Sequence, residues 1–346
     1  MSAQAKTAPL REALTQALPE RPFRVQLWDG SELSPTNGPG GPTFRVRSPR
    51  ALAHLLRAPG QLGLGRAYVS GDLELDDVDA VLELLGAYSP PPLDAREKAR
   101  VALAAARAGA LRSLPRTPAA ELRPSGRRHS RERDRRAVTH HYDVSNEFFA
   151  LLLGSSMTYS CAIFSRGAQT LEEAQAQKLE LICSKLALRS GERVLDVGCG
   201  WGSFAIHAAQ RHGVHVTGIT LSEPQAALAR ERAAEAALAE RVEIRVADYR
   251  DLAGERFDAI ASIGMVEHVG SVNIDSYARQ LSAALGPGGR LLNHGIARLR
   301  HGDPESGPFS ERFVFPDAAP LHLSRVLAAI EAAGLEPTHV EGFRAD

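Results

Sequence analysis

Residues 194–202 read Val-Leu-Asp-Val-Gly-Cys-Gly-Trp-Gly, an apolar strand pattern that runs directly into a glycine turn. A helix pattern follows over residues 203–211. Gly198, Gly200 and Gly202 carry no Cβ, so the backbone of this turn can approach a ligand closely. The N–H groups of the turn and of the new helix are free to bind that ligand. The stretch predicts a ligand-binding turn, with a purely structural turn as the alternative.

The spacing of the glycines separates two kinds of nucleotide site. The dinucleotide pattern G-x-G-x-x-G has its third glycine three positions after the second, whereas Gly202 is only two positions after Gly200. The pattern E/D-x-G-x-G-x-G, which begins here at Asp196, is instead the signature of S-adenosylmethionine (SAM) methyltransferases.

Strand and helix patterns alternate around this turn. Strands are expected at 193–197, 215–220, 242–246, 258–263 and 290–293, and helices at 171–186, 203–211, 223–239 and 273–285. Such alternation calls for a parallel, doubly wound sheet. We therefore expect an α/β fold with a Rossmann-like, mostly parallel class I SAM methyltransferase sheet and a smaller N-terminal α+β domain.

The unusual residues of this half fall where the expected strands end. These positions are 198–202, 220–225, 248–250, 264–268 and 294–296. Ligands of doubly wound sheets bind at the carboxyl ends of the strands. The five strand ends therefore predict one rim that holds a cofactor and a substrate.

The first part of the chain has shorter patterns. A hairpin is expected over residues 23–46 around the Pro/Gly/Asn-rich turn at 35–42, and a helix at 48–57. A turn-rich segment at 62–75, an acidic helix near 76–85 and an Ala/Arg helix at 93–111 follow. We expect an N-terminal accessory and lipid-docking domain at 1–114, an Arg-rich linker at 115–137, and a catalytic domain at 138–346.

Composition narrows the function classes. The 346 residues carry a formal net charge of zero, so no global field favours nucleic acid. Apolar runs are interrupted by charge well short of a membrane span, and no signal-peptide pattern opens the chain. Cys161, Cys183 and Cys199 are too few and too scattered for a disulfide framework or zinc spacing, so no metal is expected. The expectation is a reduced, cytoplasmic, soluble protein in which Cys183 and Cys199 are structural.

Positive charge is concentrated between Arg123 and Arg136, where seven arginines stand against Glu132 and Asp134. The plainer interpretation is a solvated, disordered linker. The alternative is an arm that docks on anionic lipid head groups, each basic residue adding roughly 1 kcal/mol. Both interpretations are compatible.

An ordered set of motifs in the chain resembles the cyclopropane-fatty-acyl-phospholipid synthases and their mycolic-acid relatives. The resemblance extends over residues 139–346, and residues 23–85 resemble the smaller N-terminal domain of that family. The landmarks are His140-His141-Tyr142-Asp143, Asn146, Phe148-Phe149, Met157-Thr158-Tyr159-Ser160-Cys161-Ala162, Gln177-Lys178-Leu179, Asp196 to Gly202, Gly218 to Gln225, Asp248 to Asp251, Ser262 to Gly270, and His294-Gly295-Ile296.

The resemblance implies transfer of a methyl group from SAM to a cis double bond of an unsaturated phospholipid acyl chain. Deprotonation of the resulting carbocation and ring closure give a cyclopropane. It also implies that a bound bicarbonate ion is the base, held by Cys161, Glu267, His294 and Ile296. Without the motifs, the cysteine would be read as apolar filler, the glutamate as a helix cap, and the histidine as bonded to backbone.

The resemblance also implies a set of SAM-binding residues. Tyr159, Ser160, Asp196, Gly198, Gly200 and Gly202 belong to the methionine end, Thr220, Leu221 and Gln225 surround the ribose and adenosine, and Tyr249 and Arg250 flank the adenine. Tyr249 is expected to stack on the adenine ring. Gln225 is expected where many methyltransferases use an acidic residue to bind the ribose.

Three points stay open at this level. The same cation can instead lose a neighbouring proton, giving a 10-methylene chain that a reductase could convert to a methyl branch. A catalytically impaired lipid-binding relative and a small-molecule methyltransferase are further alternatives. The family continues beyond the position of Asp346 into a tyrosine, a helical segment and a final strand, so a C-terminal truncation is expected.

The expected partners follow from a lipid substrate. They are unsaturated phospholipid in the membrane and an anionic membrane surface contacted through Arg123–Arg136, with the enzyme peripherally associated with the inner face. A homodimer and a product-consuming reductase are left open, and no nucleic acid is expected.

Overall fold

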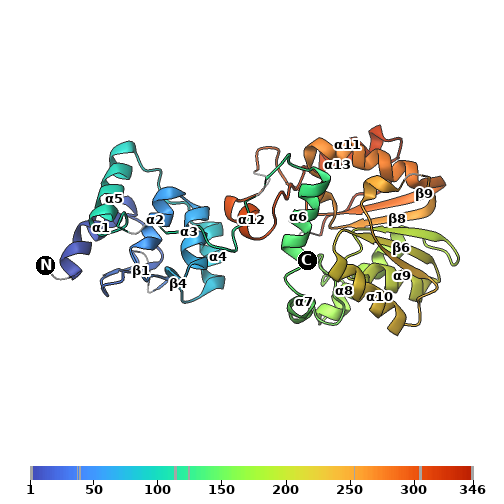
Figure 1. Cartoon of the computed structure of the whole chain (residues 1–346), viewed down its shortest axis with the longest axis horizontal. Helices are drawn as coiled ribbons and strands as arrows, with labels where there is room; N and C mark the ends of the chain where they lie inside the picture. The colour runs from blue at the N-terminus through green and yellow to red at the C-terminus, as the bar shows by residue number, and fades with distance from the viewer. Residues whose placement is uncertain are drawn as a thin grey trace. The chain divides into compact units, whose positions relative to one another are not determined.

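The computed structural model describes residues 3–36, 38, 40–112, 115–123, 125–252, 254–303 and 306–343. The chain divides into two compact units, Met1–Glu121 and Leu122–Asp346. Each unit has its own hydrophobic core. Figure 1 shows the elements of both units in chain order.

The first unit is a small α+β domain. Its elements are α1 (Ala3–Ala17), β1 (Arg24–Gln26), β2 (Glu32–Leu33), β3 (Thr43–Val46), α2 (Arg50–Arg57), α3 (Gln61–Val69), β4 (Leu73–Leu75), α4 (Val78–Ala87) and α5 (Ala95–Arg107). The strands form one sheet in the order β2-β1-β3-β4. Alternating buried side chains of the strands pack with the helices around Phe44 and Leu52.

The hairpin expected over residues 23–46 is wrong, because β1 and β3 pair in parallel. β1 instead forms its antiparallel pair with β2, through a tight turn in which Gly30 has φ 80°. The N–H of Gly30 donates to the carbonyl oxygen of Leu27 at 2.9 Å, which closes that turn. The short turn forms the hairpin, and the Pro/Gly-rich segment at 35–42 carries the chain back so that β3 runs parallel to β1.

The turn-rich interpretation of residues 62–75 is also wrong, since residues 61–69 form α3. Its glycines gave the misleading signal. A Cβ at Gly63 would lie 2.2 Å from the carbonyl oxygen of Ala58 at the end of α2. Gly63 is therefore needed for the close approach of α2 and α3 and does not mark a turn.

The second unit is an α/β domain. Its elements are α6 (Arg131–Tyr142), α7 (Asn146–Leu153), α8 (Leu171–Lys185), β5 (Arg193–Val197), α9 (Ser203–His212), β6 (His215–Thr220), α10 (Glu223–Glu235), β7 (Val242–Val246), η1 (Tyr249–Asp251), β8 (Phe257–Ile263), α11 (Val266–Ala284), β9 (Leu285–His294), α12 (Pro308–Phe313) and α13 (Leu323–Ala332). All four strand pairings are parallel, and the order is β7-β6-β5-β8-β9.

This order confirms the expected Rossmann-like fold. The chain moves outward from β5 through β6 to β7, and then returns to add β8 and β9 on the other side. The carboxyl ends of β5 and β8 therefore lie at the switch point of the sheet, where such folds bind ligands.

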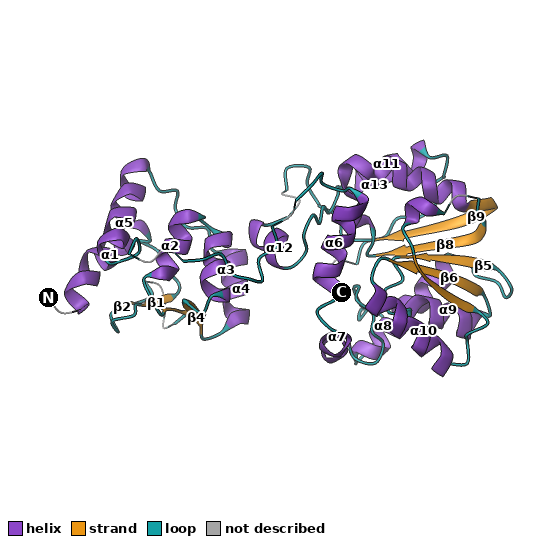
Figure 2. Cartoon of the chain, viewed as in Figure 1, coloured by secondary structure: helices purple, strands orange, loops and turns teal. Residues whose placement is uncertain are grey.

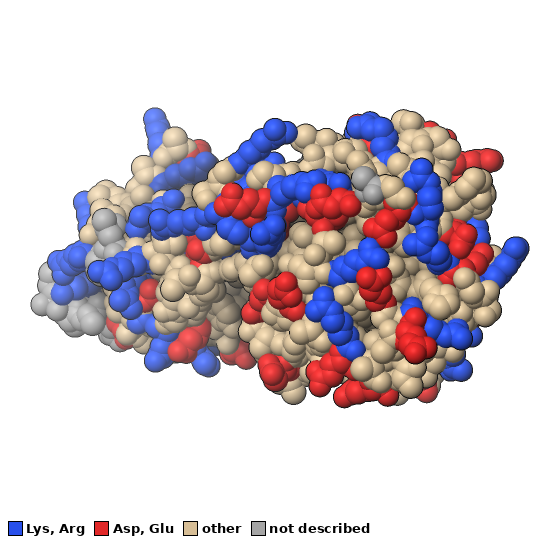
Figure 3. All heavy atoms as spheres, turned by 45° about the vertical axis from the view of Figure 1, so that its right-hand side comes forward, with Lys and Arg blue, Asp and Glu red and all other residues tan. Residues whose placement is uncertain are grey.

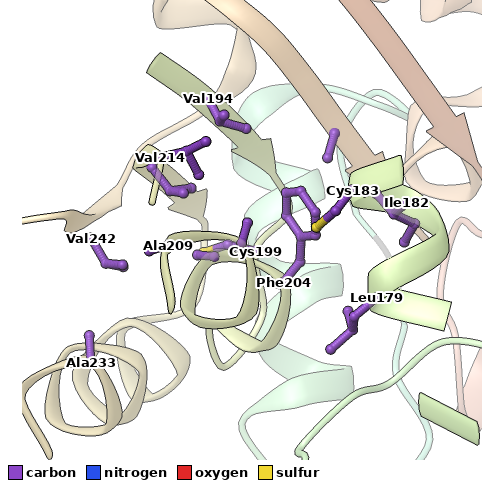
Figure 4. Close-up of a cluster of buried hydrophobic side chains, with 14 of the residues drawn as sticks. Leu179, Ile182, Cys183, Val194, Cys199, Phe204, Ala209, Val214, Ala233 and Val242 are labelled. Atoms are coloured by element: carbon purple, nitrogen blue, oxygen red, sulfur yellow. The ribbon is translucent and has the colours of Figure 1, made fainter. Parts of the chain in front are cut away.

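Helices cover both faces of the sheet, with α8, α9 and α10 on one face and α11 and α13 on the other (Figure 2). The first face packs small alanines of the helices, Cys183 of α8 and Cys199 of the glycine turn against valines of the strands, as Figure 4 shows around Cys183, Cys199 and Val194. The second face packs larger side chains, including Tyr277 and Leu281 of α11. These two cores hold the strand ends rigidly in register.

The Arg-rich stretch is more structured than the sequence suggested. The disordered-linker interpretation is wrong from residue 131 onward, where α6 begins. Arg133 donates to both carboxylate oxygens of the buried Asp317, at 2.5 and 2.6 Å. Arg131 forms an ion pair with Asp251 at 2.6 Å. Arg133 therefore has a buried acidic partner and Arg131 an ion pair at the surface, contacts that the arginines of a solvated linker would lack.

The surface carries both signs of charge, intermixed over the face drawn in Figure 3. Among the described residues, none of the helices combines the length and the apolar character needed to cross a bilayer.

Candidate active site

An open cavity lies at the carboxyl ends of β5, β6, β7 and β8. Its empty volume is about 1080 Å³, counted with space that is open to solvent. The loops after these four strands, α6 and the segment before α8 supply its lining. A cavity therefore lies at the strand ends where the sequence predicted a ligand site.

The glycine turn after β5 forms the floor of this cavity. Gly198 and Gly200 line it and have φ values of 78° and 54°, which favour glycine. A Cβ at Gly200 would meet no atom within 4 Å, so it would occupy space that a ligand can use. Gly202 does not line the cavity. It begins α9, and a Cβ there would lie 3.1 Å from Cβ of Ala229 in α10.

Most of the predicted SAM residues line the same cavity. They are Tyr159, Ser160, Asp196, Gly198, Gly200, Thr220, Leu221, Gln225, Tyr249 and Arg250. They come from four separate segments of the chain, which the parallel sheet gathers at one edge.

The loop after β6 is held by its own hydrogen bonds. Ser222 caps α10 by accepting from the N–H of Gln225 at 3.2 Å. Thr220 Oγ1 donates to Gln225 Oε1 at 2.7 Å. Ser222 Oγ donates to Asp143 Oδ1 at 2.6 Å, which ties this loop to the end of α6. Gln225 thus faces the cavity in a fixed position.

In the segment after β7, the Tyr249 ring is not freely available to stack on an adenine. The Tyr249 ring is buried and packs edge-on against Tyr277 at 5.4 Å. The Arg250 guanidinium lies over the Tyr249 ring, 5.4 Å from its centre, and donates to Asp248 Oδ1 at 2.7 Å. Arg250 also reaches Asp134 of α6 at 3.0 Å. Asp134, Asp248 and Arg250 all line the cavity as one hydrogen-bonded group.

A buried lysine that the sequence analysis quoted within a motif, without giving it a role, lines the site. Lys178 of α8 is 2% exposed, and its Nζ donates to Ser160 Oγ at 2.7 Å. Burial lowers the pKa of Lys178 to about 8, and the nearby Asp196 opposes that shift. Burial raises the pKa of Asp196 to about 7, and Lys178 opposes it in turn.

A signal for Lys178 was present in the sequence. It occurs on the apolar face of the predicted helix 171–186, between the buried Ala174 and Ile182. A charged side chain in that position is buried only with a partner. The fold supplies Ser160 and Asp196 as those partners.

Cys161 and His294 meet beside the cavity. Cys161 Sγ lies 3.1 Å from His294 Nε2, although the residues are 133 positions apart. Burial, with the charge of Lys178, lowers the pKa of His294 to about 4, so its ring is neutral at pH 7. If the thiol donates to Nε2, the ring proton is on Nδ1, which is buried and has no partner among the described residues.

Glu267 and Ile296 form the second contact of the predicted catalytic set. Glu267 lies in the first turn of α11, and its Oε1 accepts from the N–H of Ile296 at 2.7 Å. Its Oε2 is buried without a hydrogen-bond partner among the described residues. Burial raises the pKa of Glu267. The Ile296 side chain is exposed, so this residue contributes through its backbone.

These four residues adjoin the cavity without lining it. Cys161 follows the lining residue Ser160, and Glu267 precedes the lining residue His268. The geometry therefore places two paired polar contacts next to an open cavity floored by backbone.

An aromatic cluster forms one wall, and of its members the sequence analysis gave a role only to Tyr159. Tyr142, Tyr159 and Trp201 line the cavity, and Phe149 packs against the last two at 5.5 and 4.8 Å. Tyr142 Oη lies 3.2 Å from His268 Nε2, and burial lowers the pKa of His268 to about 3. This wall is apolar and holds His268 neutral.

Known proteins are similar to this chain in sequence and in fold. The family model described as mycolic acid cyclopropane synthetase matches residues 129–346. A Mycobacterium tuberculosis (strain H37Rv) protein, "Probable fatty acid methyltransferase Rv3720", is 41% identical over 336 residues, 94% of this chain and 78% of the relative. The "Cyclopropane-fatty-acyl-phospholipid synthase" of Escherichia coli K12 is 35% identical over 285 residues, 81% of this chain and 67% of the relative.

Solved structures agree with the sequence relatives. The crystal structure of "mycolic acid cyclopropane synthase CmaA1 complexed with SAH and CTAB" matches with a TM-score of 0.56 and 33% identity. The match covers 60% of this chain and 76% of that chain.

Proposed function

The chain belongs to the mycolic acid cyclopropane synthetase family and is a SAM-dependent methyltransferase, and from this premise we propose that it converts cis double bonds of phospholipid acyl chains into cyclopropanes. The names of these relatives describe enzymes that act on fatty acids or fatty acyl phospholipids, which supports the same class of substrate here. The observation that carries the proposal is the pair of contacts Cys161–His294 and Glu267–Ile296 beside the glycine-floored cavity.

The cavity fits SAM. Gly198 and Gly200 leave room for the methionine end, and Gln225 and the Asp248–Arg250 group offer polar atoms for the ribose and adenine. Bound SAM supplies an electrophilic methyl group on a sulfonium. CmaA1 was crystallised in complex with SAH, the product that remains when SAM loses this methyl group, which supports SAM as the cofactor here. The aromatic wall keeps water away from the reacting carbons.

The polar contacts also fit a bicarbonate ion. Its O–H group could donate to Glu267 Oε2, and its oxygens could accept from Nδ1–H of His294, two buried atoms that otherwise lack partners. Bicarbonate would supply the base for the proton lost on ring closure. Glu267 orients it, and the neutral His294 adds a donor without adding charge.

A lipid substrate is supported by the outer face of α7. Val144, just before this helix, and Phe148, Leu151 and Leu152 within it are exposed, and Leu151 is 90% exposed. Contiguous apolar surface on a folded domain usually marks an interaction site. The opposite face of α7 carries Phe149, which contacts Tyr159 of the cavity wall. We propose that this face dips into the bilayer surface where an acyl chain enters, aided by the exposed arginines of residues 123–136.

The test is methyl transfer to vesicles of a cis-unsaturated phospholipid. Fatty acids recovered after reaction should gain one CH₂ by mass. Both a cyclopropane and a methylene branch add this mass, so proton NMR decides between them: ring protons lie far upfield, and exomethylene protons lie in the alkene region. Methyl transfer without ring protons would replace the cyclopropane proposal by the methylene alternative. No transfer would favour the impaired lipid-binding relative.

A further inference from the structure

A cluster of metal-ligating side chains lies between α8 and α9, away from the catalytic residues. The ligand atoms of Cys183, His207 and His212 all lie within 4.8 Å of one another. Glu180 Oε2 is 3.2 Å from Nε2 of both histidines. The sequence analysis expected no metal, because the cysteines are scattered along the chain. In the fold, however, two histidines lie beside Cys183.

The packing of two helices creates this cluster. Glu180 and Cys183 are three residues apart on α8, so both project from the same side of that helix. His207 and His212 belong to α9, which packs against α8. Cys183 is fully buried beside Phe204 of α9 (Figure 4), while both histidines are partly exposed. The cluster therefore has a dry end and an end open to solvent.

We propose that Cys183, His207 and His212 hold a structural zinc ion that joins α8 to α9, and that Glu180, which contacts both histidines, turns toward Cys183 as the fourth ligand. One thiolate, two imidazoles and one carboxylate are ligands that zinc accepts in tetrahedral sites. With Zn–N and Zn–O bonds of about 2.0–2.1 Å, tetrahedral neighbours are about 3.3 Å apart, close to the 3.2 Å from Glu180 to each histidine. Zn²⁺ with one thiolate and one carboxylate is neutral, which suits a partly buried position.

Binding of Zn²⁺ releases one proton, because the metal takes a cysteine as the thiolate and displaces the thiol proton as the Zn–S bond forms. The affinity of the protein for the metal should therefore rise with pH.

A zinc ion at this site would join two helices that also contribute to the cofactor cavity. α9 starts at the glycine turn, and α8 carries Lys178 five residues before Cys183. A metal that links the two helices would fix the turn relative to Lys178. This inference does not depend on the reaction proposed above, because metal binding is measured directly.

The experiment uses the full chain, stripped with a chelator and titrated with Co²⁺ and with Zn²⁺. We expect one Co²⁺ per chain, a thiolate-to-Co²⁺ charge-transfer band in the near ultraviolet, displacement of that band by Zn²⁺, and a higher melting temperature with Zn²⁺. Cys183→Ser should remove the band, and His207→Gln should weaken binding at least tenfold. The exposed His215 offers a matched control, since His215→Gln should bind like the wild type.

Folding of the variants is checked without metal. The melting temperature of each variant in chelator is its own reference, so that the loss of the rise with Zn²⁺ reports the site even where the substitution itself lowers the melting temperature. If Cys183→Ser fails to fold, His207→Gln and His212→Gln carry the test. Co²⁺ binding without a thiolate band, unchanged affinity in both histidine variants, or less than about one tenth of a metal per chain would overturn the zinc site. These side chains would then serve only as a hydrogen-bonded cluster in which Glu180 contacts the two histidines.

Discussion

Glu267→Gln separates a catalytic role of this residue from a helix-terminal one. The amide keeps the shape and can still accept the Ile296 N–H through its oxygen, but it removes the charge and replaces Oε2 by an NH₂ group. Oε2 is the atom that has no partner among the described residues. A misplaced or missing general base costs on the order of 10²–10⁴ in rate. Turnover should fall by that factor while SAM affinity stays unchanged.

Glu267→Gln should lower turnover without lowering the stability of the fold. Because burial raises the pKa of Glu267, the folded state favours the protonated form, and this contribution to stability is lost as pH rises through the folded-state pKa. Above the folded-state pKa the ionised carboxylate is therefore a cost that glutamine removes. Loss of a negative charge from the first turn of α11 works against this by about 0.3–1 kcal/mol. The melting temperature of Glu267→Gln should be equal to or above that of the wild type.

The assay measures methyl transfer to vesicles, SAM affinity by calorimetry and melting temperature at pH 7 on the same preparations. Glu172→Gln is the matched control, since Glu172 is an exposed glutamate in the first turn of α8. It should leave turnover unchanged. A Glu267→Gln enzyme with near-normal turnover and a stability loss of about 1 kcal/mol would refute the catalytic role in favour of capping.

Three further outcomes are expected. Gly200→Val should abolish SAM binding by calorimetry, because its side chain would enter the cavity from a backbone at φ 54°; unchanged affinity would contradict the cofactor site. His294 has a lowered folded pKa of about 4, so wild-type stability should fall as pH drops from 6.5 to 4, by about 3 kcal/mol at most, and denaturant titrations of His294→Gln should show less of this loss. Leu151→Glu should weaken vesicle binding in sedimentation assays and leave SAM affinity intact, and undiminished binding would exclude α7 as the docking face.

The sequence predicted the catalytic fold well because its patterns are locally encoded. The expected strand 193–197 matches β5, and the turn at Gly198 faces the cavity that it predicted. The expected helix 273–285 matches the part of α11 that follows Gly270. Non-helical backbone at Gly270, with φ 73° and ψ 163°, separates that part from the short helix that begins at Val266, which the sequence analysis did not predict.

Other features depended on contacts that a linear pattern does not contain. α3 was missed because Gly63 serves packing against α2. Lys178 was missed because its partners Ser160 and Asp196 come from other segments. The zinc cluster was missed for the same reason: Cys183 meets histidines only after α8 and α9 pack together. Sequence reasoning finds residues that share a segment or a motif more easily than residues that only the fold brings together.

The most direct test of the proposed reaction follows the methyl carbon itself. The full chain is incubated with SAM carrying a ¹³C-labelled methyl group and vesicles of a phospholipid with a cis double bond, and the recovered acyl chains are examined by carbon and proton NMR. The proposal predicts that the label appears as the CH₂ of a cyclopropane ring at the former double bond. Label in an exomethylene carbon, or no label in the acyl chains, would contradict it.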